Sequence, residues 1–380
     1  MSRVTLGEKL DSNSGRPTGF DYLRTGLSIA IVCVHSVITS YGEAAGAMVW
    51  TLPARPLVGM LLPMFFALSG FLVAGSLFRT TSLVHFLGLR VIRIYPALAV
   101  EVLVSALLIG PLLTSVPLKE YFSDPLFYRY LLNVTGDIHY LLPGLFQHNP
   151  YPNIVNMQLW TVPYELGCYI ALSVVAALGI KRFRWMAPVA TVLLVVAYFA
   201  VRVYVKKEWA SIAIAGGLPG ELLVACFLSG VSLFLYKDRL PWSRSLCVLS
   251  GAASALLFGF IPFGDFVAVP VVAYFTVSLG VTNAKKLRLL QGADYSYGIF
   301  LYGFVLQQAV AATLPWAREW WINILLCVPA AIGVAAISWH FIEKPALNLR
   351  RYFQPKRHVA YGFESLPASK PVLPATRMQT

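Results

Sequence analysis

Long apolar runs alternate with short polar connections along this chain of 380 residues. A helix that crosses a bilayer needs about 20 predominantly apolar residues, and ten runs approach or reach that length. They cover residues 20–40, 57–78, 92–113, 159–179, 186–204, 217–236, 245–262, 266–282, 296–314 and 320–341. The runs 245–262 and 266–282 are the least regular, because the first contains two glycines and a proline and the second is short. The pattern predicts an all-α, polytopic membrane helix bundle of about ten transmembrane helices.

The composition agrees with this class and excludes a soluble domain. Hydrophobic residues make up 58% of the chain and charged residues only 12%, which is too apolar for a protein surrounded by water. We expect a polar cytoplasmic segment over 1–19, a transmembrane domain over 20–345 and a flexible cytoplasmic tail over 346–380. This division leaves no separate soluble catalytic domain, so the bundle itself should carry the function.

The basic residues predict how the bundle lies in the membrane. If both termini are cytoplasmic, 23 of the 30 Lys and Arg residues fall on the inner segments, as the positive-inside rule requires. Arg202, Lys206 and Lys207 are exceptions that fall outside. The net charge of +13 is therefore mainly an orientation signal with some attraction to anionic membrane lipids, and it does not indicate nucleic-acid binding. We expect a multi-pass protein of a bacterial inner membrane.

One connection, residues 114–158, is much longer than the others and should face the outside. Loops of this length are usually functional or disordered, and the many aromatic residues here favour an ordered, partly embedded cap that contacts carbohydrate or lipid headgroups. The simpler alternative is an interfacial belt of aromatic residues with histidines on the surface.

Two ionisable residues, Arg24 and His35, lie inside the first apolar run. Their separation of eleven residues brings them to within roughly 20° of the same helix face and about 16 Å apart along the axis. Ionisable side chains are costly inside a membrane unless they face the protein interior or a wet cavity. The spacing therefore indicates a functional site that reaches from one surface into the membrane.

Six sequence blocks follow one another in a characteristic order. The first, FDYLRTGLSIAIVCVHS, contains the Arg and His separated by ten residues. The others are PMFFALSGFLVAGSLFR, FLGLRVIRIYPAL, NPYPNIVNMQLWTVPYELGCYI, SYGIFLY and FIEKPAL. Together they resemble the acyltransferase 3 family of integral membrane O-acyltransferases, which modify bacterial surface polysaccharides, in its single-domain branch. The sequence departs from the family at Met157 and Gln158, where Gly-Ser commonly stands.

The resemblance implies acyl transfer to a hydroxyl, which needs a base that works near neutral pH. Histidine suits this task, and His35 is the only histidine predicted deep within a span. Glu165 enters with the fourth span at a similar depth, where it could orient the imidazole; a structural buried carboxylate is the alternative. Trp160, Asn156 and Tyr164 belong to the same block and are expected at the acceptor substrate, although boundary aromatics also anchor helices.

The donor side is predicted to be basic. Arg90 and Arg93 lie three residues apart and so share one face at the cytoplasmic end of the third span, near Arg24 at the start of the first. These guanidiniums could hold the phosphates of acetyl-CoA, the expected co-substrate. The alternative, judged by residue type alone, is that these arginines set the orientation of the helix in the membrane and extend toward lipid headgroups.

We therefore expect a membrane-bound O-acyltransferase that moves a short acyl group, acetyl above all, from acyl-CoA to a hydroxyl of a cell-surface polysaccharide or its lipid-linked precursor. No metal is expected, and the oligomeric state stays open. One alternative keeps the chemistry but has a small secreted acceptor, such as a macrolide or a lipid-oligosaccharide. Another is a proton-coupled transporter that uses His35 as a relay.

Overall fold

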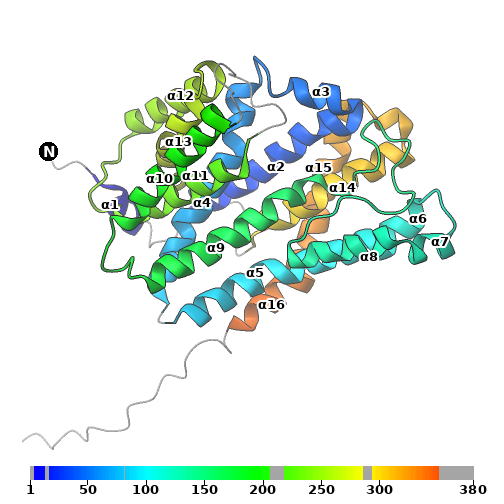
Figure 1. The fold of residues 1–380 in the computed structure, drawn as a ribbon, viewed down its shortest axis with the longest axis horizontal. Helices are drawn as coiled ribbons and strands as arrows, with labels where there is room; N and C mark the ends of the chain where they lie inside the picture. The colour runs from blue at the N-terminus through cyan, green and yellow to red at the C-terminus, as the bar shows by residue number, and fades with distance from the viewer. Residues whose placement is uncertain (1–3, 13–16, 81, 206–217, 286–292, 351–380) are drawn as a thin grey trace, which may run out of the picture.

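The computed structural model describes residues 4–12, 17–80, 82–205, 218–285 and 293–350, and this part of the chain forms a bundle of helices (Figure 1). The longer helices are α2 (Thr18–Tyr41), α4 (Arg55–Arg79), α5 (Leu83–Val104), α9 (Val162–Ala177), α10 (Met186–Ala200), α11 (Gly220–Leu235), α12 (Arg244–Phe260), α13 (Gly264–Gly280), α14 (Ser296–Thr313) and α15 (Trp320–Ser338). Each of the ten predicted apolar runs falls largely on one of these helices. The predicted fold class is confirmed.

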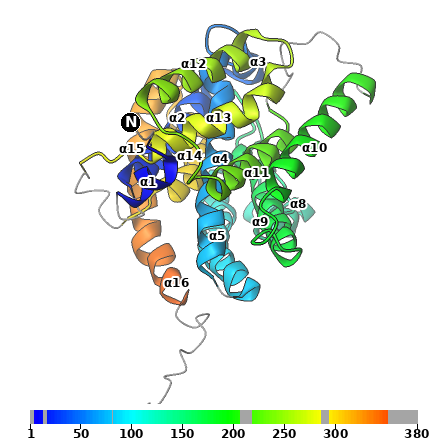
Figure 2. The same ribbon diagram turned by 90° about the vertical axis from the view of Figure 1, so that its left-hand side faces the viewer.

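Six helical stretches of the described residues are long and apolar enough to cross a membrane. They are Thr18–Tyr41, Arg55–Arg79, Leu83–Leu113, Met157–Ala177, Met186–Val205 and Trp320–Asn348. The apolar helices α11, α12 and α13 are shorter. Figure 2 shows α2, α4, α13 and α14 near the middle of the bundle, with α10 and α15 toward opposite edges.

Shorter elements connect or extend these helices. The α-helical ones are α1 (Leu6–Asp11), α3 (Glu43–Met48), α6 (Gly110–Leu113), α7 (Leu118–Ser123), α8 (Pro125–Leu131) and α16 (Lys344–Asn348). The 3₁₀ turns are η2 (Leu132–Thr135), η3 (Met157–Thr161) and η6 (Pro315–Ala317), and π-helical turns occur at η1 (Ser105–Ile109), η4 (Val201–Val205) and η7 (Trp339–Glu343). The polar N-terminal segment is ordered over α1, where the Leu6 amide donates to the Leu240 carbonyl at 2.9 Å.

The third span begins earlier than its sequence predicted. The prediction placed its start at residue 92, whereas α5 begins at Leu83. Arg90 and Arg93 therefore lie within the helix, two to three turns from its first residue, and not at its end. Arg90 and Arg93 interrupt the apolar pattern there, so the sequence predicts a polar connection where the structure has a helix.

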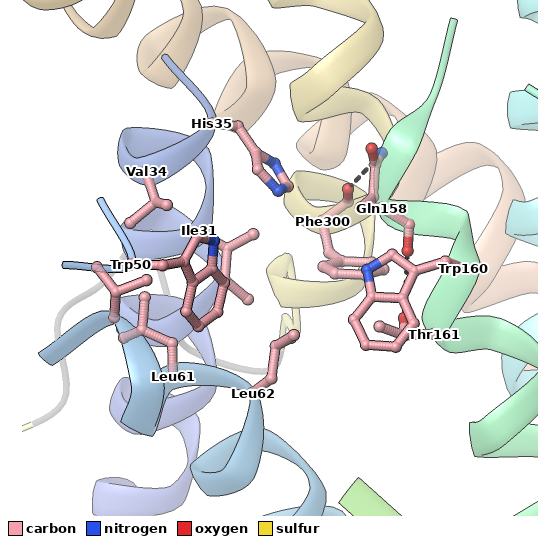
Figure 3. Close-up of a pocket in the computed structure, with 11 residues that line it drawn as sticks. Ile31, Val34, His35, Trp50, Leu61, Leu62, Gln158, Trp160, Thr161 and Phe300 are labelled. Carbon is pink, nitrogen blue, oxygen red and sulfur yellow. Dashed lines mark hydrogen bonds between the residues drawn. The ribbon is translucent and has the colours of Figure 1, made fainter. Parts of the chain in front are cut away.

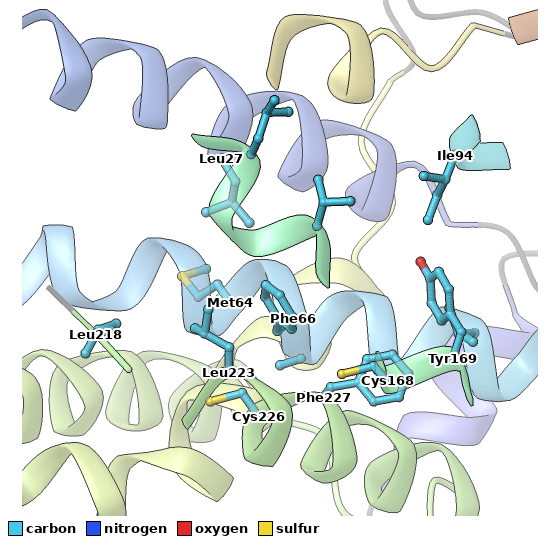
Figure 4. Packing of buried hydrophobic residues seen from close by; sticks show 14 of the residues in the cluster. Leu27, Met64, Phe66, Ile94, Cys168, Tyr169, Leu218, Leu223, Cys226 and Phe227 are labelled. Atoms are coloured by element: carbon cyan, nitrogen blue, oxygen red, sulfur yellow. The ribbon is translucent and has the colours of Figure 1, made fainter. Parts of the chain in front are cut away.

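The core packs most closely where α4 meets α11. A Cβ atom on Gly70 of α4 would lie 2.0 Å from the Phe227 carbonyl oxygen, and one on Gly230 of α11 would lie 2.0 Å from the Ala67 carbonyl oxygen. Small residues of this kind let two membrane helices approach backbone to backbone. Figure 4 shows Met64 and Phe66 of α4 beside Leu223 and Cys226 of α11 in the same cluster.

The long connection before α9 contains helical elements and is here called the cap. It contains α7, α8 and η2, and Tyr121 and Tyr130 are fully buried in it. Gln308 of α14 fastens the cap to the bundle, because its amide nitrogen donates to the carbonyls of Tyr151 and Ile154 at 2.7 Å each. Its contact with carbohydrate or headgroups stays a prediction.

A buried ion pair explains one exception to the positive-inside pattern. Arg202 is 1% exposed, and its guanidinium lies 3.3 Å from the Asp265 carboxylate of α13, beside the rings of Phe263 and Phe266. An arginine held in this way serves packing and carries little topological information. Lys206 and Lys207, the other two exceptions, lie outside the described residues.

Candidate active site

Helix α2 presents Arg24 and His35 to two adjoining hollows of the bundle. The helix runs unbroken from Thr18 to Tyr41, so the shared face predicted from the spacing is formed. Arg24 lines a large cavity, and His35 lines a small pocket farther along the helix. Ser28, between them, donates from its hydroxyl to the Ser296 carbonyl at 2.9 Å and so fixes α2 against α14.

The large hollow, here called the basic cavity, has a volume of about 840 Å³, which suits a ligand of nucleotide size. Helices α2, α4, α5, α9 and α14 contribute to its walls. Its basic lining residues are Arg24, Arg79, His85, Arg90, Arg93 and Arg350. The three arginines predicted to bind the donor are thus brought together in one cavity.

Two of these arginines are held by one carboxylate. Arg24 and Arg93 each place a guanidinium nitrogen 2.5 Å from the same oxygen of Asp294. Arg93 also lies 3.8 Å from the buried Glu343 carboxylate. Burial alone would raise the pKa of the Asp294 carboxyl, but Arg24 and Arg93 outweigh it and hold that pKa well below its usual range. The cluster is therefore largely charge-compensated.

Arg90 has a different environment. One guanidinium nitrogen donates to the Ser76 hydroxyl at 3.1 Å, and the group lies over the rings of Phe86 and Tyr169. Its Nε atom is buried without a hydrogen-bond partner, and none of the ion pairs found among the described residues involves it. Of the three predicted donor arginines, Arg90 has the least of its charge satisfied by the protein.

The predicted contact between Glu165 and His35 is not made in this structure. Glu165 lies in the first turn of α9, lines the basic cavity and accepts a hydrogen bond from the Tyr169 hydroxyl. The i to i+4 spacing of these two residues places the phenol beside the carboxylate. Glu165 therefore lines the cavity of the arginines and not the pocket of His35. An orienting role for Glu165 stays a prediction, because no direct contact between Glu165 and His35 supports it.

His35 lies in a pocket of about 50 Å³, here called the histidine pocket. Its ring packs edge-on against Phe304 with 5.3 Å between ring centroids, and it makes no hydrogen bond with another described residue. Figure 3 shows the imidazole projecting into the space between α2 and the segment that carries Gln158 and Trp160. The ring nitrogens are thus not committed to a partner within the described protein.

The two hollows share three lining residues. Leu62 of α4, Thr161 of η3 and Phe300 of α14 border both the basic cavity and the histidine pocket. We call these three residues the junction. The arginine-rich cavity and the space beside His35 border each other at these residues.

The predicted acceptor residues divide into three cases. Trp160 lines the histidine pocket. Tyr164 contacts Trp160 edge-on at 5.9 Å but lines neither hollow, and its ring packs over Gly220. Asn156 is fully buried and lines neither hollow; its amide donates to the Glu101 carboxylate and to the Leu301 carbonyl. The structure therefore gives Asn156 a packing role in place of the expected substrate contact.

Several site residues were not singled out by sequence reasoning. Gln158, where the family's Gly-Ser is missing, donates to the carbonyls of Phe300 and Leu301 at 2.9 and 2.7 Å and so fixes η3 to α14. Asp294 joins the site through its contacts with Arg24 and Arg93. Trp50 and Leu62 look like any other apolar residues of the sequence. The one signal available for Asp294 was an acidic residue two positions before the serine that begins α14.

Comparison with known proteins agrees with this site. Residues 18–342 match the family model described as an acyltransferase domain. The chain is similar to an O-acetyl transferase of Shigella phage Sf6, with 25% identity over 76% of this chain and 85% of the relative. It is also similar to Nodulation protein 10 of Rhizobium leguminosarum bv. viciae, with 27% identity over 93% of this chain and 99% of that protein. No solved structure matches. The chain belongs to the acyltransferase 3 family, and it is a multi-pass membrane acyltransferase.

Proposed function

We propose that this protein is an O-acyltransferase that moves a short acyl group from acyl-CoA to a hydroxyl of a cell-surface polysaccharide or its lipid-linked precursor. The O-acetyl transferase relative supports acetyl as the group. The observation that carries the proposal is the junction, through which a thioester held in the basic cavity can reach the only histidine of the pocket.

In this proposal the donor lies in the basic cavity, with its phosphates near Arg90. Arg24 and Arg93 join the phosphate site by exchanging part of their contact with Asp294 for contact with the ligand. Charge-assisted hydrogen bonds from guanidinium groups suit phosphate oxygens. The pantetheine arm then leads past Leu62, Thr161 and Phe300 toward His35.

The transfer step follows from the position of His35. The acceptor hydroxyl oxygen attacks the thioester carbonyl carbon while the imidazole takes the hydroxyl proton. The new ester C–O bond forms, the C–S bond breaks, and the proton passes from the imidazole to the departing coenzyme A thiolate. Trp160 offers an apolar ring against which an acceptor sugar can pack.

We further propose that the basic cavity opens to the cytoplasm of a bacterial cell and that the protein resides in the inner membrane. The distribution of basic residues supports this orientation, with both termini inside. The acyl-CoA donor is a cytoplasmic metabolite, and Arg90 and Arg93 lie near the start of the helical stretch Leu83–Leu113, whereas the cap with α7 and α8 follows its end (Figure 1). The acceptor would then approach from the cap side.

The test of this function is a pair of histidine variants. His35→Ala should lower acceptor acylation by a factor of about 10² to 10⁴, the usual contribution of a general base, while coenzyme A binding to the purified protein stays unchanged. His340→Ala, at an exposed histidine that lines neither hollow, is the matched control and should acylate normally. Full acylation by His35→Ala would refute the mechanism.

A further inference from the structure

The histidine pocket has two chemically different walls. On the η3 side, Gln158 and Thr161 place polar atoms beside His35. The opposite wall is formed by apolar side chains of α2, of α4 and of the turn that precedes α4. These are Ile31, Val34, Trp50, Val58 and Leu61, here called the recess. Figure 3 shows Trp50, Val34 and Leu61 grouped on this side, across the space from Gln158 and Trp160.

We propose that the recess receives the acyl chain of the donor and sets the longest chain that the protein can transfer. The inference rests on the function proposed above, because it requires the thioester to arrive through the junction. Leu62 of the junction is adjacent in sequence to Leu61 of the recess, so an acyl group that passes the junction meets the recess beside His35.

The chemistry of each wall of the histidine pocket indicates which part of the reacting groups lies against it. A thioester carbonyl oxygen favours a hydrogen-bond donor, and an acceptor hydroxyl needs the imidazole. The acyl methyl group needs neither, and burying it against apolar side chains is favourable by about 0.8 kcal/mol per carbon. The recess offers such a surface on the side of the pocket that faces away from Trp160, which is left for the acceptor.

The size of the pocket limits what can enter. A volume of about 50 Å³ corresponds to roughly four water-sized groups when one group needs about 10–15 Å³. An acetyl group, with its three non-hydrogen atoms, fits within this space. A butyryl group is two carbons longer and must push side chains aside, which typically costs about 1–3 kcal/mol.

The turn that carries Trp50 is held in place by the side chain of Arg55. Arg55 is buried, and its guanidinium donates to the Phe258 carbonyl at 2.8 Å and to the Trp50 carbonyl at 3.5 Å. The turn that carries the indole is thereby tied to α12. Removing the indole should therefore enlarge the recess without moving its backbone.

The experiment measures donor binding by calorimetry on the purified protein without acceptor. Coenzyme A, acetyl-CoA, butyryl-CoA and hexanoyl-CoA are the ligands. The wild-type protein should bind acetyl-CoA about tenfold more tightly than butyryl-CoA, the ratio that corresponds to about 1.4 kcal/mol. Trp50→Ala and Leu61→Ala should bring butyryl-CoA to within about threefold of acetyl-CoA.

Two controls make the result specific. Leu57→Ala is the same change on α4 at a side chain that is 71% exposed and points away from the pocket; it should keep the wild-type order of donors. Val58→Phe should fill the recess and weaken acetyl-CoA while leaving coenzyme A unchanged, which also shows that the protein is folded.

The possible failures are distinguishable. If none of the four ligands binds the wild-type protein, the proposed function fails together with this inference. If coenzyme A and the acyl-CoAs bind but their order is the same in wild type, Trp50→Ala and Leu61→Ala, the donor site stands and the assignment of the recess is overturned.

Discussion

The three predicted donor arginines of the basic cavity differ in the protein groups that already bind them. Arg24 and Arg93 face Asp294, whereas the main hydrogen-bond partner of Arg90 is the Ser76 hydroxyl. A guanidinium that is not yet paired with a carboxylate can meet a phosphate without first giving up an ion pair. At the scale of single residues, Arg90 is therefore the group whose contribution to donor binding should be easiest to measure.

We expect Arg90→Lys to weaken coenzyme A binding by roughly tenfold, even though the charge is kept. Lysine cannot form a bidentate contact, and one charge-assisted hydrogen bond contributes about 1.5–3 kcal/mol. Calorimetry with coenzyme A alone measures this directly. Arg182→Lys, the same change at an exposed residue outside the cavity, is the control. An unchanged affinity of Arg90→Lys for coenzyme A would contradict the phosphate contact. Arg90 would then only set the orientation of its helix in the membrane.

At the scale of elements, the sequence predicted the helices better than their ends and faces. Apolar runs long enough to span a membrane carry a strong signal, so all ten predicted segments coincide with helices. The start of α5 was missed because two arginines interrupted the apolar pattern. Glu165 was predicted beside His35 but lines the basic cavity, since the face it shows depends on how η3 leads into α9. Asp294 and Trp50 belong to the site only through contacts between distant segments, which no local pattern reveals.

The close approach of α4 and α11 gives a prediction about stability. Gly230→Ala should destabilise the protein, because the new Cβ would lie 2.0 Å from the Ala67 carbonyl oxygen and the helices would have to separate. The melting temperature in detergent should fall by several degrees relative to wild type.

Gly333→Ala provides the matched control for this change. Nothing lies within 4 Å of a Cβ atom at that position, and alanine is a better helix former than glycine by roughly 0.5–1 kcal/mol. Its melting temperature should stay the same or rise. Equal melting temperatures for Gly230→Ala and wild type would show that the contact between α4 and α11 is looser than described.

At the scale of the whole molecule, the proposed function requires the donor and the acceptor to reach the site from opposite sides of the membrane. In inside-out vesicles prepared from bacteria that express the protein, acetyl-CoA added outside the vesicles meets the face that was cytoplasmic. We expect free thiol to appear in that outer medium and the membrane's own glycans to gain acetyl groups.

Right-side-out vesicles given the same acetyl-CoA should release no thiol, because the donor then meets the cap. Vesicles with His35→Ala control for other thioesterases. A transporter would leave the thioester intact in both orientations. Movement of a labelled solute driven by a proton gradient, without thiol release, would therefore contradict the proposed acyl transfer. It would favour a proton-coupled transporter that uses His35 as a relay.

The narrow junction also bears on the energetics of the reaction in a living cell. If the basic cavity is continuous with the cytoplasm, the electrical potential of the membrane falls mainly between the junction and the outer surface. In the proposed step the hydroxyl proton, which comes from the outer side, ends on a thiol at the inner side. An acyl group moves outward in exchange, and a neutral thioester and a neutral hydroxyl become a neutral thiol and a neutral ester, so no net charge crosses the membrane. Acyl transfer through this protein would then be independent of the membrane voltage in its overall equilibrium and would draw its driving force from the thioester bond.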